Sequence, residues 1–319
     1  MEYPRVGRRG VAAPDTGAYA QLDDLIRLQF KARGFSFLPR QPVHSLLSGR
    51  HASRLRGRGL NFEELRRYLP GDDIRTIDWR VTARTRKPHV RVFTEERDRP
   101  VLLVVDQRQS MFFGSRRAMK SVVAAETAAV AAWRVLSVGD RVGALVFDDH
   151  DVVEIRPHRS HARVMHILKA VVEKNHALRV DAGVTVSPGM LNGALERAHR
   201  LAKHDFLVCV ISDFHGLDAD TEGLALRLAE HNDVILAFVH DPLEAEIPDT
   251  GPVVVAGGEL QLEVNTSSAE LRRRFSEDFE ARLDRIRAIA RKGATPVIPL
   301  RTTEGVPEQL RRIIGSAGR

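Results

Sequence analysis

Three short apolar segments, each followed at once by an aspartate, place the strongest constraint on the fold of this chain. Continuous apolar runs of this length are typical of strands that are buried on both faces, as in a parallel sheet. Ligands bind outside the carboxyl ends of such strands, so the pattern predicts one rim that carries three carboxylates. The segments are VLLVV at 101–105, FLVCVIS at 206–212 and VILAFVH at 234–240, and they precede Asp106, Asp213 and Asp241.

Segments of helical character alternate with these strands, which indicates an α/β fold. RVGALVF at 141–147 and VVEIRP at 152–157 flank the turn-forming tetrad DDHD, and this pattern predicts a hairpin at the sheet edge. We therefore expect a doubly wound, mainly parallel sheet with helices on both faces and an antiparallel edge. The expected helices span about 116–136, 161–174, 190–203 and 219–231.

The C-terminal part continues the α/β pattern. VVVAG and QLEV predict a small hairpin, and Ser267 with Glu270 predicts a capping box that opens a long amphipathic helix. That helix is expected to end near Gly293. A last strand, TPVIPL, and a helix over 307–314 complete the expected domain of residues 100–319.

The first third of the chain differs from the rest in charge. The whole chain has a net charge of +7, but residues 1–100 carry 21 Lys and Arg against 12 Asp and Glu, a net of +9. A surface of this kind could contact nucleic acid, an acidic protein or anionic lipid; the alternative is that the arginines are solvated and pair locally. We treat residues 1–99 as a basic N-terminal extension.

Several classes of protein are disfavoured by what the sequence lacks. No apolar run approaches the roughly 20 residues of a membrane helix, and no apolar stretch follows the basic N-terminus, so a cytoplasmic protein is expected. The single cysteine, Cys209, excludes an internal disulfide and a cysteine-based zinc site. The chain has no Walker-type or GxGxxG loop and no Gly-x-Ser-x-Gly elbow.

Clustered carboxylates at one rim require a compensating positive charge. Carboxylate and hydroxyl oxygens suit Mg²⁺ or Mn²⁺, and Ser110 and Thr185 could supply the hydroxyls. The alternative is that the aspartates only cap helices and satisfy turns.

Two segments resemble a known group of proteins. DQRQSMFFGS at 106–115 resembles the first metal-site loop of von Willebrand factor A domains, which has the pattern Asp-x-Ser-x-Ser. GRGLNFEELRRYLPGDDIRTIDWRVTAR at 57–84, with its core from Gly71 to Trp79, resembles the hallmark of the bacterial domain-of-unknown-function family numbered fifty-eight. The resemblance covers the chain from about residue 43 to its end.

The resemblance implies a von Willebrand factor A-like fold and an adaptor or assembly factor that works with a MoxR-type AAA+ ATPase and a client protein. Asp106 and Ser110 match the first and last positions of the loop pattern, and Asp213 matches the aspartate of the later Ser-Asp motif. Thr185 matches the threonine motif, for which Ser187 could substitute.

Arg108 departs from the family pattern, because it stands at the middle serine of the loop. A guanidinium has no lone pair for a cation and keeps its proton at any accessible pH. Either Arg108 points away and leaves a weakened three-ligand metal site, or it lies between Asp106 and Asp213 and replaces the metal. We favour the second arrangement, because it supplies the compensating charge.

The hallmark segment concentrates acids, bases and an aromatic side chain. It could be a docking surface or an anion-binding loop, or it could be a salt-bridged turn that ties the extension to the core with the tryptophan as apolar anchor. The residues concerned are Asp72, Asp73, Arg75, Asp78, Trp79 and Arg84.

Together these features predict a non-catalytic protein-binding adaptor that contacts its partner at the Asp106 rim, through a bridging metal if one binds. Nucleic-acid binding by the basic N-terminal third is an alternative. A metal-dependent phosphoesterase is a second alternative, in which Arg108 would contact phosphate, but no general base accompanies the carboxylates.

Overall fold

The computed structural model describes residues 17–32, 60–70, 72–95, 99–179, 187, 189–257 and 260–316. The chain forms two compact units. The smaller unit is Leu38–Asp98, and the larger unit combines Met1–Phe37 with Arg99–Arg319. The expected extension of residues 1–99 is thus shared between the two units, because residues 17–32 pack with the residues that follow Arg99.

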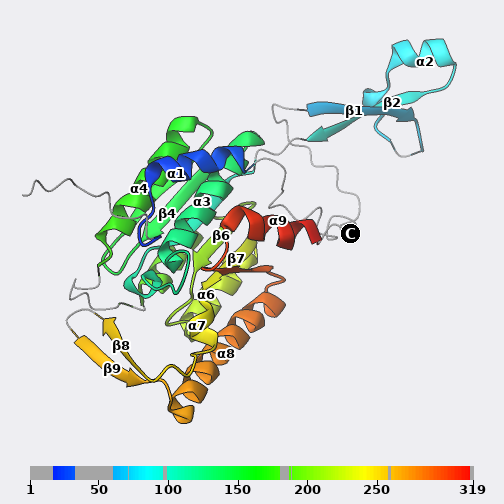
Figure 1. Ribbon diagram of the computed structural model, residues 1–319. Coiled ribbons are helices and arrows are strands. Elements are labelled where there is room, and N and C mark those ends of the chain that lie inside the picture. Colours follow the sequence, from blue (N-terminus) through cyan, green and yellow to red (C-terminus); the bar gives the residue numbers. More distant parts are fainter. Residues whose placement is uncertain are drawn as a thin grey trace, which may run out of the picture. The chain divides into compact units, whose positions relative to one another are not determined.

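A six-stranded sheet runs through the larger unit, within the described residues (Figure 1). Its strand order is β10-β7-β6-β3-β4-β5, in which all neighbours are parallel except the edge pair β4 and β5. This doubly wound order with an antiparallel edge confirms the expected fold class. The strands are β3 (Val101–Asp106), β4 (Val142–Phe147), β5 (Val152–His158), β6 (Leu207–Ser212), β7 (Asp233–His240) and β10 (Val297–Arg301).

Helices cover both faces of this sheet. Because successive residues of a strand point to opposite faces, alternate side chains of one strand belong to different apolar cores. Leu103 and Val105 of β3 belong to one apolar core, and Leu102 and Val104 belong to the other. The first core includes residues of α1 (Leu22–Arg27), α3 (Lys120–Ser137), α4 (His161–Ala177) and α9 (Val306–Ser316). The second includes residues of α5 (Gly189–Leu201), α6 (Ala219–Ala229) and α8 (Ala269–Lys292).

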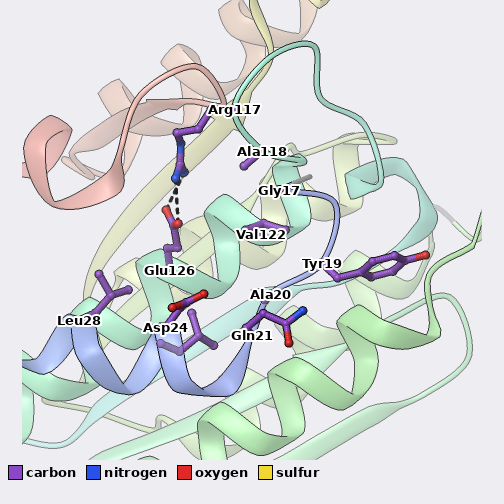
Figure 2. A pocket seen from close by; sticks show the side chains of 11 residues that line it. Gly17, Tyr19, Ala20, Gln21, Asp24, Leu28, Arg117, Ala118, Val122 and Glu126 are labelled. Carbon is purple, nitrogen blue, oxygen red and sulfur yellow. Dashed lines mark hydrogen bonds and ion pairs between the residues drawn. The ribbon is translucent and has the colours of Figure 1, made fainter. Parts of the chain in front are cut away.

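The N-terminal helix α1 and the short 3-10 helix η1 (Leu28–Phe30) belong to the first core. Leu25 is buried, its carbonyl accepts a hydrogen bond of 3.0 Å from the indole N–H of Trp133, and Ala20 N–H donates to Asn175 Oδ1 at 2.7 Å. A pocket of about 280 Å³ remains where this segment meets α3, and the ion pair of Arg117 with Glu126 lies at its wall (Figure 2). These contacts explain why residues 17–32 group with the sheet.

The smaller unit is built on an antiparallel hairpin of β1 (Leu60–Arg67) and β2 (His89–Glu95). The segment that connects the two strands contains the 3-10 helix η3 (Ile74–Thr76) and the seven-residue helix α2 (Trp79–Thr85). The edge strand expected over HVRVFTEE is therefore β2, and its partner β1 carries part of the hallmark segment.

The expected C-terminal hairpin is present as β8 (Pro252–Gly257) and β9 (Leu260–Asn265). The expected capping box of Ser267 with Glu270 is wrong: the N-cap of α8 is Ser268, whose side chain accepts from Leu271 N–H. No helix among the described residues is long and apolar enough to cross a membrane.

Candidate functional site

The strand order reverses between β3 and β6, and this position is the topological switch point at which doubly wound sheets bind ligands. Asp106 is the last residue of β3, and Asp213 directly follows β6. The chain leaves β3 through the 3-10 helix η4 (Gln109–Met111), whose N-cap residue is Arg108. The sequence-predicted rim is thus assembled from two adjacent strands and the loop after the first of them.

Arg108 lies against Asp106 in a closed set of hydrogen bonds. Its Nη2 is 2.7 Å from Oδ2, its Nε is 3.0 Å from Oδ1, and its backbone N–H donates to Oδ1 at 2.9 Å. Ser212 Oγ donates to Oδ2 at 2.6 Å. A carboxylate offers about four lone-pair directions. The four donors just described therefore occupy the acceptor directions of Asp106. The guanidinium also donates to His215 O at 3.2 Å.

Asp213 is held by a second cation. Lys120 Nζ lies 2.8 Å from its Oδ2, and Arg108 Nη2 lies 3.8 Å from its Oδ1. The same Oδ1 accepts from His215 N–H at 2.9 Å and from Ser110 Oγ at 3.4 Å. Lys120 Nζ also forms an ion pair with Glu244 Oε1, at 2.7 Å. Two carboxylates of the rim are therefore matched by two cations of the same chain.

Burial makes this network electrostatically strong. Asp106, Arg108 and Asp213 are fully buried, and Lys120 is 2% exposed. Burial alone would favour the neutral forms, but attraction to the neighbouring carboxylates raises the pKa of Arg108 and of Lys120. Burial likewise opposes ionisation of Asp213, yet Lys120 and Arg108 lower its pKa. Arg108, Lys120 and Asp213 therefore keep their charges over the physiological pH range.

Asp241 follows β7 at the same rim but has other partners. Its Oδ2 accepts from the backbone N–H and the hydroxyl of Ser115, at 2.8 and 2.9 Å, and from the Thr302 hydroxyl. Its side chain caps the four-residue helix α7 (Pro242–Ala245) through Leu243 N–H. Burial opposes its charge, but these hydrogen bonds lower its pKa. Here the capping role that the sequence left open is the one that the geometry supports.

The donor set does not fit a magnesium or manganese site. The oxygens of Asp106 and Asp213 receive hydrogen bonds from protein donors, and Arg108 stands at a ligand position of the family pattern with no lone pair to offer. Among the described residues no group of three or more His, Cys, Asp or Glu could hold a metal ion. Thr185 lies outside the described residues, and Ser187 is placed with its N–H 2.8 Å from Asp149 Oδ1.

Acids of the hallmark segment, which belongs to the smaller unit, stabilise local turns. Asp72 binds the Arg66 guanidinium through both oxygens, at 2.7 and 2.8 Å, and Asp73 accepts from Arg75 N–H at 2.9 Å. Asp78 caps α2 by accepting from Arg80 and Val81 N–H. Asp72 forms an ion pair, and Asp73 and Asp78 accept backbone hydrogen bonds, so all three acids stabilise this turn locally. That the turn ties the extension to the core stays a prediction.

Trp79 and Arg84 do not take part in that turn through buried contacts. Trp79 is 70% exposed, and Arg84 lies exposed in the last turn of α2. Trp79 is therefore not an apolar anchor within the smaller unit.

Sequence reasoning missed Lys120, Glu244 and Ser212 as members of the network. Lys120 is the first residue of α3, whose next five residues are buried, and a lysine so close to a continuous apolar helix could have marked it as a buried cation. Glu244 lies three residues after Asp241, where it reads as an ordinary capping-box partner. Its contact with Lys120 crosses 124 positions of sequence and left no local signal.

Above the buried charges the rim exposes other groups. Phe113 is 39% exposed, its ring centroid lies 5.9 Å from Lys120 Nζ, and His215 is exposed. A hollow of about 440 Å³ is lined by His215 and its neighbours in the loop after β6, by Glu244 and by α8. The rim therefore offers an aromatic, partly apolar surface to a ligand.

Comparisons with known proteins agree with the sequence resemblance. The model of a family described as "Protein of unknown function DUF58" matches residues 64–285. Uncharacterized proteins of Mycobacterium bovis and Mycobacterium tuberculosis are 31% identical over 313 residues, which is 97% of this chain and 95% of each relative.

Two solved structures are similar to this chain over about two thirds of its length. The conserved hypothetical protein BatB from Bacteroides thetaiotaomicron is 15% identical, covers 69% of this chain and 98% of its own, and has a TM-score of 0.44. The VWA domain of SpRpn10 is 12% identical, covers 67% of this chain and 94% of its own, and has a TM-score of 0.35.

Proposed function

The chain belongs to the DUF58 family of proteins of unknown function, and from that premise we propose that it is a non-catalytic protein-binding adaptor whose rim works without metal. The partner binds at the carboxyl ends of β3 and β6. By family resemblance the partner is a MoxR-type AAA+ ATPase, which would act with the adaptor on a client protein.

One observation carries this proposal: Arg108 and Lys120 neutralise Asp106 and Asp213 inside the protein. A rim that used a divalent cation to bind a partner's carboxylate would keep its aspartate oxygens open to that cation. Here the oxygens are hydrogen-bonded to protein donors, so a partner is held by direct contacts with the surface above them. A preformed, rigid surface of this kind loses little entropy on binding.

The same geometry argues against metal-dependent phosphoester hydrolysis. A phosphoesterase at this rim would need a cation or a free guanidinium to bind the phosphate, and a base for the attacking water. Arg108 is fully buried and bound to Asp106. The buried carboxylate of Asp213 is held in its charged form by Lys120 and Arg108 and is directed at them. The binding role therefore suits these residues better than the catalytic one.

The surface that would meet the partner is aromatic. The Phe113 ring lies 5.9 Å from Lys120 Nζ, His215 is exposed, and aromatic residues are enriched in protein interfaces. Because the buried network fixes the loops that carry them, we expect the free and bound rims to have the same shape.

A calorimetric titration with Mg²⁺ and Mn²⁺ tests whether the rim works without metal. The wild-type protein is expected to give only heats of dilution. A clear binding isotherm that Asp106→Ala abolishes would contradict the proposed replacement of the metal by Arg108.

A pull-down with a purified MoxR-type ATPase, with nucleotide present, tests the partner. The wild-type protein should retain the ATPase, and the variants Phe113→Ala and His215→Ala should retain it at least tenfold more weakly. The control Arg156→Ala changes an exposed side chain on the edge strand β5 and should have no effect. Failure to retain the ATPase in every nucleotide state would refute that partner, and equal retention by all variants would refute the rim as its binding surface.

A further inference from the structure

Exposed apolar side chains are concentrated in the smaller unit. Among the described residues eight large hydrophobic side chains are exposed, and four of them lie between positions 65 and 79. Of the described apolar side chains from 65 to 90, by contrast, Val90 is the buried one. Apolar area left in water is unfavourable, and several large exposed apolar side chains within one short segment indicate an interaction surface. The four residues are Leu65, Leu69, Ile74 and Trp79, and we call them the hallmark surface.

The backbone that carries the hallmark surface is held by specific contacts. Asp72 joins Arg66 of β1 to the turn and accepts from Leu69 N–H at 2.8 Å. Asp78 caps α2, and its own N–H donates to His89 O of β2 at 2.8 Å. Trp79, the next residue, therefore starts from a fixed backbone position. A large aromatic side chain on a fixed backbone loses little entropy when a partner covers it.

Basic residues follow Trp79 along α2 and the turn after it. Arg80, Arg84, Arg86 and Lys87 are exposed, and no acidic residue occurs from Trp79 to Val90. The one acid just before them, Asp78, is buried as the helix cap. A partner that covers this segment gains from carboxylates, which arginine binds with two parallel hydrogen bonds.

We propose that the hallmark surface and the arginines of α2 form a second docking site, which binds an acidic face of a partner protein and takes Trp79 into an apolar pocket. Tryptophan and arginine are the residues most enriched among the energetic centres of protein interfaces. The aliphatic side chains Leu65, Leu69 and Ile74 favour a protein over a nucleic acid, because single-stranded nucleic acids are bound by stacking on aromatic rings and by cations. This site lies in the smaller unit and is independent of the rim at β3 and β6, so each proposal can fail without the other.

Tryptophan fluorescence of the full chain provides a direct test, because the two tryptophans differ in exposure. Trp79 is 70% exposed and Trp133 is 4% exposed, so iodide should quench Trp79 selectively. The variant Trp79→Phe gives the contribution of Trp133 alone. The probe is a helical peptide in which turns of Glu residues alternate with turns of Leu residues. Two control peptides have the same length: one contains Glu without Leu, and the other contains Lys and Leu.

The Glu and Leu peptide is expected to shift the Trp79 emission to shorter wavelength and to protect it from iodide. With binding measured by the anisotropy of a dye on the peptide, Trp79→Ala, and separately the double variant Arg80→Glu with Arg84→Glu, should weaken binding at least tenfold. The matched control Arg200→Glu reverses an exposed arginine on α5 of the larger unit and should change the affinity less than twofold. The two control peptides should bind at least tenfold more weakly, and added salt should weaken binding.

Three results would overturn the proposal. Trp79 emission that is already short in wavelength and protected from iodide in the isolated chain would mean that the protein covers this surface itself. Absence of peptide binding at the highest soluble peptide concentration would exclude an acidic protein as the partner of this surface. Tight binding of a single-stranded oligonucleotide that Trp79→Ala abolishes, without peptide binding, would assign the surface to nucleic acid.

Discussion

The Nη2 atom of Arg108 lies 2.7 Å from Oδ2 of Asp106, and both side chains are fully excluded from solvent. The two residues are separated by one position in sequence, so the ion pair closes within a single loop at the end of β3. A pair of this kind fixes the loop geometry, because removal of either charge leaves the other buried without its partner.

Arg108→Ser restores the serine of the Asp-x-Ser-x-Ser pattern and should create a metal site. We expect a loss of about 3–5 kcal/mol in the free energy of unfolding without metal, because Asp106 loses its buried counter-ion. Added Mg²⁺ should return part of that stability through binding to the folded state. Urea unfolding with and without Mg²⁺ measures both effects. Arg108→Ala is the control without a hydroxyl ligand; equal responses of both variants, or of wild type, would contradict the expectation.

Lys120 and Asp213 should be strongly coupled. Lys120→Met or Asp213→Asn alone removes the nearest counter-ion of a buried charge, which keeps only its second partner, Arg108 or Glu244, and should cost up to about 3–5 kcal/mol of unfolding free energy. The double variant leaves neither charge and should cost less than the two single losses added together, with an interaction energy of about 1–3 kcal/mol. A double-mutant cycle by urea unfolding measures this coupling. Additive losses would show that the contact at 2.8 Å contributes nothing of its own.

Two hydroxyls at the rim should differ in their contributions to stability. Ser212 Oγ donates to Asp106 at 2.6 Å and accepts from Phe214 N–H at 2.9 Å, whereas Ser110 Oγ lies 3.4 Å from Asp213. Ser212→Ala leaves a buried N–H without a partner and should cost about 1–3 kcal/mol of unfolding free energy. Ser110→Ala, the matched control, should cost less than about 1 kcal/mol. Equal losses in thermal or urea unfolding would contradict this ranking.

Stability should depend on pH in two separate limbs. The pKa of Asp213 is lowered by folding, so its contribution is complete above its unfolded pKa of about 3.9 and is lost as pH falls through the lower folded value. The pKa of Lys120 is raised, so its contribution is complete below its unfolded pKa of about 10.4 and is lost as pH rises through the higher folded value.

Urea midpoints measured across pH test both limbs. The contribution of this network should be level between about pH 5 and pH 9, about one unit inside those unfolded values, where the unfolded groups are almost fully charged. Asp213→Asn should reduce the decline in acid, and Lys120→Met should reduce the decline in base. A wild-type decline that neither variant changes would assign the pH dependence to other groups.

Sequence alone was sufficient for the parts of the fold that depend on local pattern. The apolar runs before Asp106, Asp213 and Asp241 predicted buried parallel strands, because a strand covered on both faces needs apolar side chains at every position. The turn between β4 and β5 predicted the antiparallel edge. Arg108 was recognised as a cation at a ligand position, because a guanidinium cannot coordinate a metal in any fold.

Only the tertiary structure decided which groups meet at the rim. Lys120 reaches Asp213 across 93 positions and Glu244 across 124, and such contacts follow from the order of the strands and the packing of α3 against the sheet. Asp241 shares the sequence pattern of the other two aspartates, yet it accepts hydrogen bonds from Ser115 and Thr302 and caps α7. Exposure of Trp79 was likewise invisible in sequence. Strand and helix periodicity is a local property of the chain, whereas burial and ion pairing depend on side chains that the fold brings together from distant segments.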